Sequence, residues 1–154
     1  MELKTKINAE AGHQELTITR EFDLPLEWLF KAYVDPEIVA EWMGTKVLKL
    51  DCFNHGSYQF VTTDPKGHQH RFNGVFHEII PQQKIIRTFE MEQTPFAAQL
   101  EFLEFEKIDA TTSLLTMHII YKSVELRDQM LQMPFAQGIN MAHNRLQEIV
   151  KKLL

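Results

Sequence analysis

The sequence has 154 residues, of which 44% are hydrophobic and 24% are charged, the balance of one ordinary globular domain. A chain of this length buries roughly 70% of the surface that it exposes when unfolded, so its core needs no metal or disulfide support. Sixteen basic against 21 acidic side chains give a net charge of −5 without a dense basic run, which excludes the usual pattern of a nucleic-acid-binding protein. We expect a single domain over residues 1–154.

Cysteine content and hydropathy predict a cytoplasmic protein. Cys52 has no second cysteine with which to form an internal disulfide, as is typical of proteins in a reducing compartment. The first residues contain no apolar block of the signal-peptide kind, and no stretch approaches the ~18 apolar residues of a membrane span. We therefore expect no membrane partner.

The first third of the chain predicts a hairpin followed by two short helices. Leu3, Thr5 and Ile7 alternate with polar residues, and a similar alternation resumes over residues 16–22, so the first strand forms an outer edge. Pro25 suits a first helical position. Asp35 can cap a second helix, which Gly44 would end.

Turn signals recur every 8 to 12 residues in the middle of the chain, as expected for consecutive antiparallel strands. β-branched and aromatic residues dominate the segments between the turns. Six strands are predicted, at residues 47–53, 57–62, 70–80, 84–92, 98–106 and 112–121.

Beyond Ser123 the apolar spacing becomes helical, and Pro134 should bend or restart the helix. The apolar stripe consists of Phe135, Ile139, Ala142, Leu146, Ile149 and Leu153. These elements predict an α+β fold of the helix-grip type, in which a bent antiparallel sheet wraps around the long C-terminal helix. A curved sheet over a single helix favours a cavity between them.

Several motifs, in this order and spacing, resemble the START-like, Bet v 1-like superfamily, in the branch named after the C-terminal domain of the activator of the heat-shock protein 90 ATPase. They lie at residues 18–25, 29–33, 35–36, 42, 56–60, 64–67, 72–81 and 85–89. In the last helix they lie at residues 127–128, 130–132, 138 and 145–146. The resemblance implies a helix-grip fold with an internal cavity, and members that bind lipid-like or flavonoid-like ligands, cyclise polyketides or respond to stress. Trp42-Met43 and His55-Gly56 depart from the usual Trp-Trp and Gly-Gly. Met133-Pro134 departs from the smaller residues usual at this point, which affects the expected shape of the cavity mouth.

The 11 Phe, 2 Trp, 3 Tyr and 7 Met indicate either a dense core or the lining of a pocket. His118, in an apolar strand, is a candidate polar anchor. The candidate cavity residues are Trp42, Tyr58, Phe60, Phe76, Phe89, Phe102, Met117, His118 and Met141.

The sequence offers few groups for metal binding or catalysis. His68 and His70 can face one side of a strand near His55 and His77, but no further ligand completes a known metal spacing, so we predict no metal. His77 and Glu78 should point to opposite faces unless a bulge intervenes. We expect Glu78 to pair with Arg87 or with a backbone group.

No nucleophile motif, phosphate loop or dinucleotide fingerprint occurs, so we predict no catalytic residue and no cofactor. The leading hypothesis is a binding domain for a hydrophobic, lipid-like or aromatic small molecule. One alternative is a polyketide cyclase or aromatase in which Tyr58, Glu78 or His118 moves a proton. A second is a co-chaperone that binds a protein. A homodimer through the first strand or the outer face of the last helix is a further possibility.

Overall fold

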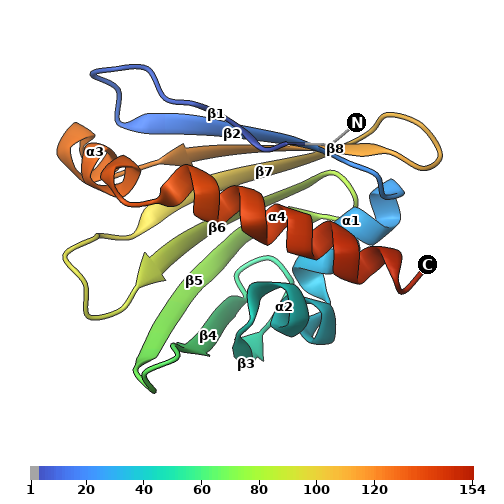
Figure 1. Ribbon diagram of the computed structural model, residues 1–154, viewed down its shortest axis with the longest axis horizontal. Helices are drawn as coiled ribbons and strands as arrows, with labels where there is room; N and C mark the ends of the chain where they lie inside the picture. The colour runs from blue at the N-terminus through green and yellow to red at the C-terminus, as the bar shows by residue number, and fades with distance from the viewer. Residues whose placement is uncertain (1–3) are drawn as a thin grey trace.

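The computed structural model describes residues 4–154. Within them, eight strands form one antiparallel sheet in the order β1-β2-β8-β7-β6-β5-β4-β3, accompanied by four helices. Figure 1 shows the sheet curving around the long helix α4 (Phe135–Lys151), with α1 (Leu26–Val34) and α2 (Pro36–Met43) near its C-terminal end. The predicted helix-grip architecture is confirmed.

The N-terminal hairpin consists of β1 (Lys6–Asn8) and β2 (Glu15–Phe22), with Ile7 opposite Ile18. β1 lies at one end of the sheet, as expected for an edge strand. Leu3, which was included in the predicted strand, lies outside the described residues.

The two tandem helices are confirmed with small changes at their ends. Pro25 is the cap rather than the first residue of α1, and its carbonyl accepts hydrogen bonds from the amides of Trp28 and Leu29. The Asp35 carboxylate accepts from the amides of Glu37 and Ile38 and thereby caps α2. Gly44 ends α2 at φ +60°, a conformation that favours glycine.

All six strands predicted in the middle of the chain are present, with ends that differ by a few residues. They are β3 (Lys46–Leu50), β4 (Ser57–Thr63), β5 (Gln69–Ile80), β6 (Lys84–Met91), β7 (Gln99–Lys107) and β8 (Ser113–Ile120). The pairing register shifts between Phe76 and Glu78, so a bulge does intervene at His77. A second shift lies between Val47 and Lys49.

The C-terminal helical region is divided at Pro134 into α3 (Val124–Gln132) and α4. Met133 is extended, and the ring of Pro134 supplies no amide for a continuing helix. The Ser123 hydroxyl caps α3 by accepting from the Leu126 amide. Pro134 therefore restarts the helix, one of the two predicted outcomes.

The core lies between the concave face of the sheet and the helices. On β7 and β8 the odd-numbered side chains are buried, except for Lys107 at the end of β7, whereas their even-numbered neighbours face the convex side. α4 contributes Leu146 and Val150 to the core. No helix in residues 4–154 is both long enough and apolar enough to span a membrane.

Candidate functional site

A buried polar cluster occupies the centre of the concave face. The sheet register places Arg87 of β6 opposite Glu101 of β7, and the Arg87 Nε donates to Glu101 Oε1 over 2.9 Å. Gln99, two residues earlier on the same face of β7, donates from Nε2 to the other Glu101 oxygen over 2.7 Å. Because both carboxylate oxygens are engaged, the pair satisfies the usual condition for burying charge.

Two tyrosine rings lie close to the Arg87 guanidinium. Its Cζ lies 5.9 Å from the Tyr33 ring centroid and 5.6 Å from that of Tyr58, within the range of cation–π contacts. The Tyr58 hydroxyl donates to the Thr88 carbonyl over 2.6 Å. Burial is the main cause that raises the pKa of both phenols above the ordinary value, so they are neutral at physiological pH.

Burial is the largest single cause acting on the pKa of Arg87 and lowers it. The charge of Glu101, its hydrogen bond and the two tyrosines together outweigh burial and hold the pKa above the ordinary value. The Arg87 guanidinium is therefore charged, and the Glu101 carboxylate balances that charge within the core. A ligand that entered this region would meet a guanidinium whose position is already fixed by the sheet.

Tyr121 follows β8 directly and adds a free hydroxyl to this part of the core. The residue is 4% exposed, and its hydroxyl has no hydrogen-bond partner among the described residues. Burial, then the charge of Glu101, raises its pKa, whereas Arg127 lowers it. An unsatisfied buried hydroxyl costs about 1–3 kcal/mol, so a bound group that accepted or donated a hydrogen bond here would recover part of that energy.

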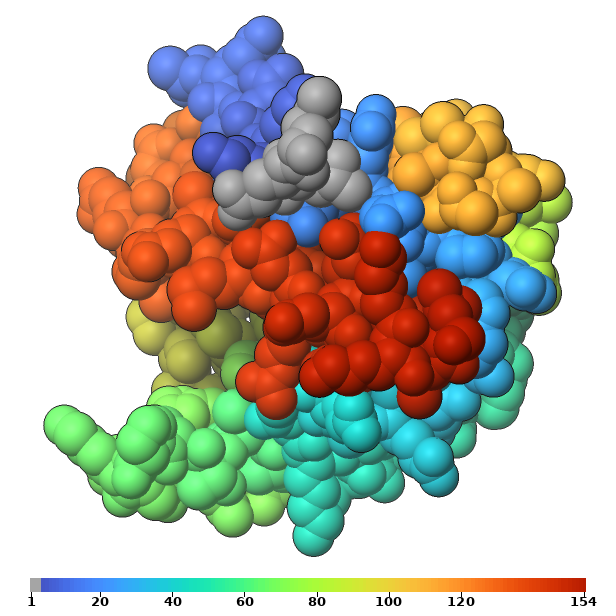
Figure 2. Space-filling view, turned by 45° about the vertical axis from the view of Figure 1, so that its right-hand side comes forward, coloured from blue at the N-terminus to red at the C-terminus, as the bar shows by residue number. Residues whose placement is uncertain are grey.

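Aromatic and aliphatic side chains surround the polar cluster. The rings of Phe72 and Phe89 stack with centroids 5.6 Å apart, and both are only partly buried. Phe135 and Ile139, near the start of α4, are likewise partly buried. Figure 2 shows a hollow between this orange part of α4 and the green strands β4 and β5. The concave face thus combines an apolar wall, a fixed charge pair and a partly open flank.

Gly74 is required for this arrangement because Tyr58 lies directly over it. A Cβ at residue 74 would come within 2.0 Å of the Thr88 carbonyl oxygen and 2.5 Å of the Tyr58 ring. The bend of β5 and the position of Tyr58 therefore depend on the absence of a side chain.

Five of the nine predicted cavity residues lie on the concave face, namely Tyr58, Phe60, Phe76, Phe89 and Met117. Trp42 is buried between α1 and α2, where its Nε1 donates to the Ala32 carbonyl over 2.7 Å and its ring meets Tyr33 edge-on. Trp42 therefore packs against Tyr33 and holds its ring in place.

Three predicted positions are wrong. Phe102 and His118 are paired on the convex face, where their rings stack 6.0 Å apart and His118 lies 3.3 Å from a Glu15 carboxylate oxygen. Adjacent strand residues point to opposite faces, so Met117 and His118 cannot both face α4. Met141 lies off the apolar stripe of α4 and is 61% exposed.

The proton-transfer groups suggested for a cyclase do not converge. Glu78 pairs with Lys84 at 2.7 Å rather than with Arg87, and its side chain is 37% exposed. The bulge at His77 shifts the register so that Glu78 lies opposite Ile86. With His118 on the convex face, Tyr58 is left as the one member of the trio on the concave face.

The histidines near the β4–β5 turn flank an aspartate. His70 Nε2 lies 3.1 Å and His68 Nδ1 3.5 Å from Asp64 Oδ2, and all three side chains are near the surface. The hydrogen bond from His70 is the largest cause lowering the pKa of Asp64. Across residues 4–154, no group of three or more His, Cys, Asp or Glu side chains is arranged to hold a metal ion.

Sequence reasoning missed Glu101, Gln99 and Tyr121, and it gave Arg87 the wrong partner. The available signal was the polar residues Gln99 and Glu101 at the same parity as Leu103 and Phe105. A polar pair in the buried row of a strand indicates either an internal ion pair or a ligand site.

Comparison with known structures supports the fold. A Rhodobacter sphaeroides protein and a Mycobacterium smegmatis protein each share 19% identity and a TM-score of 0.86 with this chain; the alignments cover 98% and 99% of this chain and 100% of each of those chains. DynU16, a protein from the dynemicin biosynthetic locus, aligns with 12% identity and a TM-score of 0.72 over 90% of this chain and 47% of its own. These likenesses show the fold alone.

No curated protein matches the sequence. A family model described as Activator of Hsp90 ATPase homolog 1-like protein matches residues 23–151, which include α1, α2, strands β3 to β8 and the C-terminal helices. This match spans most of the chain and includes every residue of the polar cluster. The protein therefore belongs to the Activator of Hsp90 ATPase homolog 1-like family, within the START-like, Bet v 1-like superfamily.

Proposed function

We propose that this chain is a binding domain for a small, largely apolar molecule that carries one polar group. The ligand would lie between the sheet and α4, with its apolar body against Phe72 and Phe89. Its polar group would approach Arg87 and the Tyr121 hydroxyl. The observation that carries the proposal is the buried Arg87–Glu101–Gln99 cluster together with the Tyr121 hydroxyl, which has no hydrogen-bond partner among residues 4–154.

The chemistry of the cluster favours a ligand with a hydroxyl, carbonyl or carboxylate. A guanidinium donates several hydrogen bonds, and a phenol can donate or accept, so oxygen-bearing groups match both. Phe72 and Phe89 present a stacked pair that suits a flat ring or an acyl chain. Aromatic or polyketide-like molecules and lipids with oxygen at one end meet these requirements.

The test compares two probes that differ by one oxygen, 2-naphthol and naphthalene, with dodecanoate as a lipid probe. We expect 2-naphthol to raise the melting temperature more than naphthalene does at the same concentration. In the variant Tyr121→Phe the affinity for 2-naphthol should fall about fivefold, as expected for the loss of one hydrogen bond of ~1 kcal/mol.

Phe102→Leu, on the convex face, is the matched control and should bind both probes as the wild type does. Native mass spectrometry of the purified protein would reveal a ligand carried through purification. The proposal fails if none of the three probes changes the melting temperature and no bound mass is found.

The co-chaperone alternative rests on the family description and stays a prediction, as does the homodimer. Pull-down with heat-shock protein 90 tests the first, and the mass in solution tests the second. Retention of the chaperone by wild type and by Tyr121→Phe alike would place that interaction outside the concave site.

A further inference from the structure

The outer side of α1 carries a surface feature that the proposed ligand site does not use. Two adjoining hollows, of about 340 and 250 Å³, share Trp28 and Lys31. We call their combined surface the α1 trough. It is lined by Glu27, Trp28, Phe30, Lys31, Val34, Asp35, Glu37, Ile38, Glu41, Gln82 and Leu153. None of these residues belongs to the Arg87–Glu101–Gln99 cluster.

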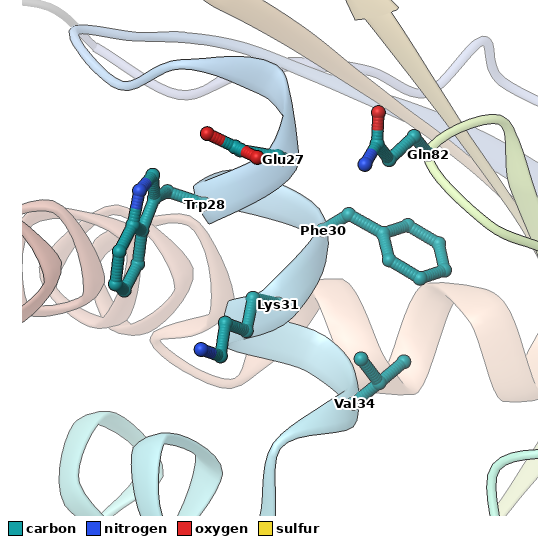
Figure 3. A pocket seen from close by; sticks show the side chains of 6 residues that line it. All are labelled: Glu27, Trp28, Phe30, Lys31, Val34 and Gln82. Carbon is teal, nitrogen blue, oxygen red and sulfur yellow. The ribbon is translucent and has the colours of Figure 1, made fainter.

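The trough has a firm apolar base. Figure 3 shows Trp28 and Lys31 on one side of α1, with Phe30 and Val34 on the other, toward Gln82. Phe30 is held in place by an edge-on contact with Phe105, with centroids 5.0 Å apart. Apolar side chains on both sides of the helix, one of them an indole, form the kind of surface that anchors aliphatic side chains of a partner.

The polar groups of the trough are mainly acidic. Four carboxylates, those of Glu27, Asp35, Glu37 and Glu41, accompany the single ammonium of Lys31. Asp35 is used as a helix cap, but Glu27, Glu37 and Glu41 form no ion pair with any of residues 4–154.

Helix electrostatics account for only some of these acids. Glu27 and Glu37 lie in the first turns of α1 and α2, where a negative charge is favourable. Glu41 lies near the other end of α2, whose last turn has no basic residue and where the helix dipole opposes a carboxylate. The helix dipole therefore does not stabilise the charge of Glu41. A cationic group of a partner would stabilise it.

The indole of Trp28 already binds a cation in the free protein. The Lys31 ammonium lies 4.8 Å from the ring centroid. Residues three apart on a helix are neighbours, so this contact is local. A guanidinium is more weakly hydrated than an ammonium and stacks on indole more readily.

From this geometry we propose that the α1 trough docks a segment of a partner protein in which arginine alternates with aliphatic residues. The guanidinium groups would pair with Glu37 and Glu41 and stack on Trp28. The aliphatic side chains would lie against Phe30, Val34 and Ile38. Charge complementarity carries the choice of partner, because four carboxylates oppose one cation on an apolar base.

The test is calorimetric titration of the full chain with a five-residue peptide in which leucine and arginine alternate, and with its citrulline counterpart. We expect only the arginine peptide to bind, with an affinity that falls as salt is added. Glu37→Gln and Glu41→Gln should each weaken binding about threefold to fivefold, and Trp28→Ala about tenfold. Glu106→Gln, which removes an exposed charge on β7, is the matched control and should leave binding unchanged.

Nuclear magnetic resonance provides a readout that is independent of folding defects. The indole signal of Trp28 should shift on addition of the peptide, whereas that of the buried Trp42 should stay in place. Equal binding of the two peptides, equal binding by Trp28→Ala and wild type, or binding of free arginine as tight as that of the peptide would overturn the proposal. A dimer in solution that Trp28→Ala dissociates would also overturn it, since a second copy would then occupy the trough.

Discussion

Two buried polar clusters lie on the concave side of this sheet, and they are built differently. In the first, Arg87, Glu101 and Gln99 come from neighbouring strands and satisfy one another. In the second, Arg20 of β2 donates to the side-chain oxygens of Asn140 and Asn144 on α4, over 3.2 and 2.8 Å. The first cluster is completed within the sheet, whereas the second joins the sheet to the helix.

The second cluster also includes Thr5, which directly precedes β1, and a buried histidine. The Thr5 amide donates to the Asn140 side-chain oxygen over 3.0 Å, and the Thr5 hydroxyl lies 2.7 Å from His143 Nδ1. His143 is fully buried beneath an edge-on contact with Phe22. Four hydrogen bonds, two that involve Thr5 and two from Arg20, thus hold the middle of α4 against the N-terminal hairpin. The hydrogen bonds of the Arg87 cluster join residues of β6 and β7 and involve no residue of α4.

The largest loss of stability is expected when the Arg87–Glu101 pair within the sheet is broken. Glu101→Ala would leave the Arg87 guanidinium buried without its carboxylate, and we expect a loss of about 3–5 kcal/mol in the free energy of unfolding. Urea denaturation of the variant measures this loss. The double variant Arg87→Met with Glu101→Leu should recover most of it, because an apolar pair of similar volume needs no compensation. A double variant as unstable as the single one would contradict this account.

Acid should weaken the cluster between helix and sheet. Burial, followed by the charge of Arg20, lowers the pKa of His143 from 6.5 to about 3. Between these pH values His143 binds a proton in the unfolded chain but not in the folded chain. Its contribution to the free energy of unfolding is therefore fully present above pH 6.5 and falls as the pH drops toward 3. At pH 5 the loss is about 2 kcal/mol.

Unfolding measured between pH 5 and 7 tests this assignment, because the exposed carboxylates with lowered pKa values titrate below that range. His143→Gln should show a flatter dependence of stability on pH than the wild type does. Parallel curves for the two proteins would assign the dependence to other groups.

A smaller effect on the free energy of unfolding is expected from the side-chain amide of Asn140, which joins three segments of the chain. Asn140→Ala removes the acceptor of the Thr5 amide and of one Arg20 nitrogen, and should cost about 1–2 kcal/mol. Hydrogen exchange should then increase first at β1 and in the middle of α4. Uniform acceleration across the whole sheet would show that the cluster does not act locally.

The smallest effect concerns Tyr121. Tyr121→Phe removes a buried hydroxyl that has no hydrogen-bond partner in the described part of the chain, so the free protein should be unchanged or more stable by up to about 1 kcal/mol. Thermal unfolding checks this in the absence of ligand. A clear destabilisation would mean that the hydroxyl serves the fold rather than a ligand.

Comparison of expectation with structure shows where sequence patterns are informative. Asp35, Gly44 and Ser123 mark helix ends through local hydrogen bonds and backbone conformation, and each was read correctly. The strands were found because turn residues separate them. The sequence predicted less well which face of the sheet each strand residue occupies, because both alternating rows of β7 mix apolar and acidic side chains. Phe102 was therefore placed on the wrong face.

The sequence by itself determined the order of elements, the antiparallel sheet, the restart of the helix at Pro134 and the helix-grip class. All of these depend on interactions between residues near one another in the chain, or on a pattern shared with a family. Only the tertiary structure decided that Arg87 meets Glu101 rather than Glu78, because the bulge at His77 and the β6–β7 register set those partners. It also decided that Tyr121 lacks a partner and that Trp28 lies in an acidic trough. Such features depend on which distant segments come together.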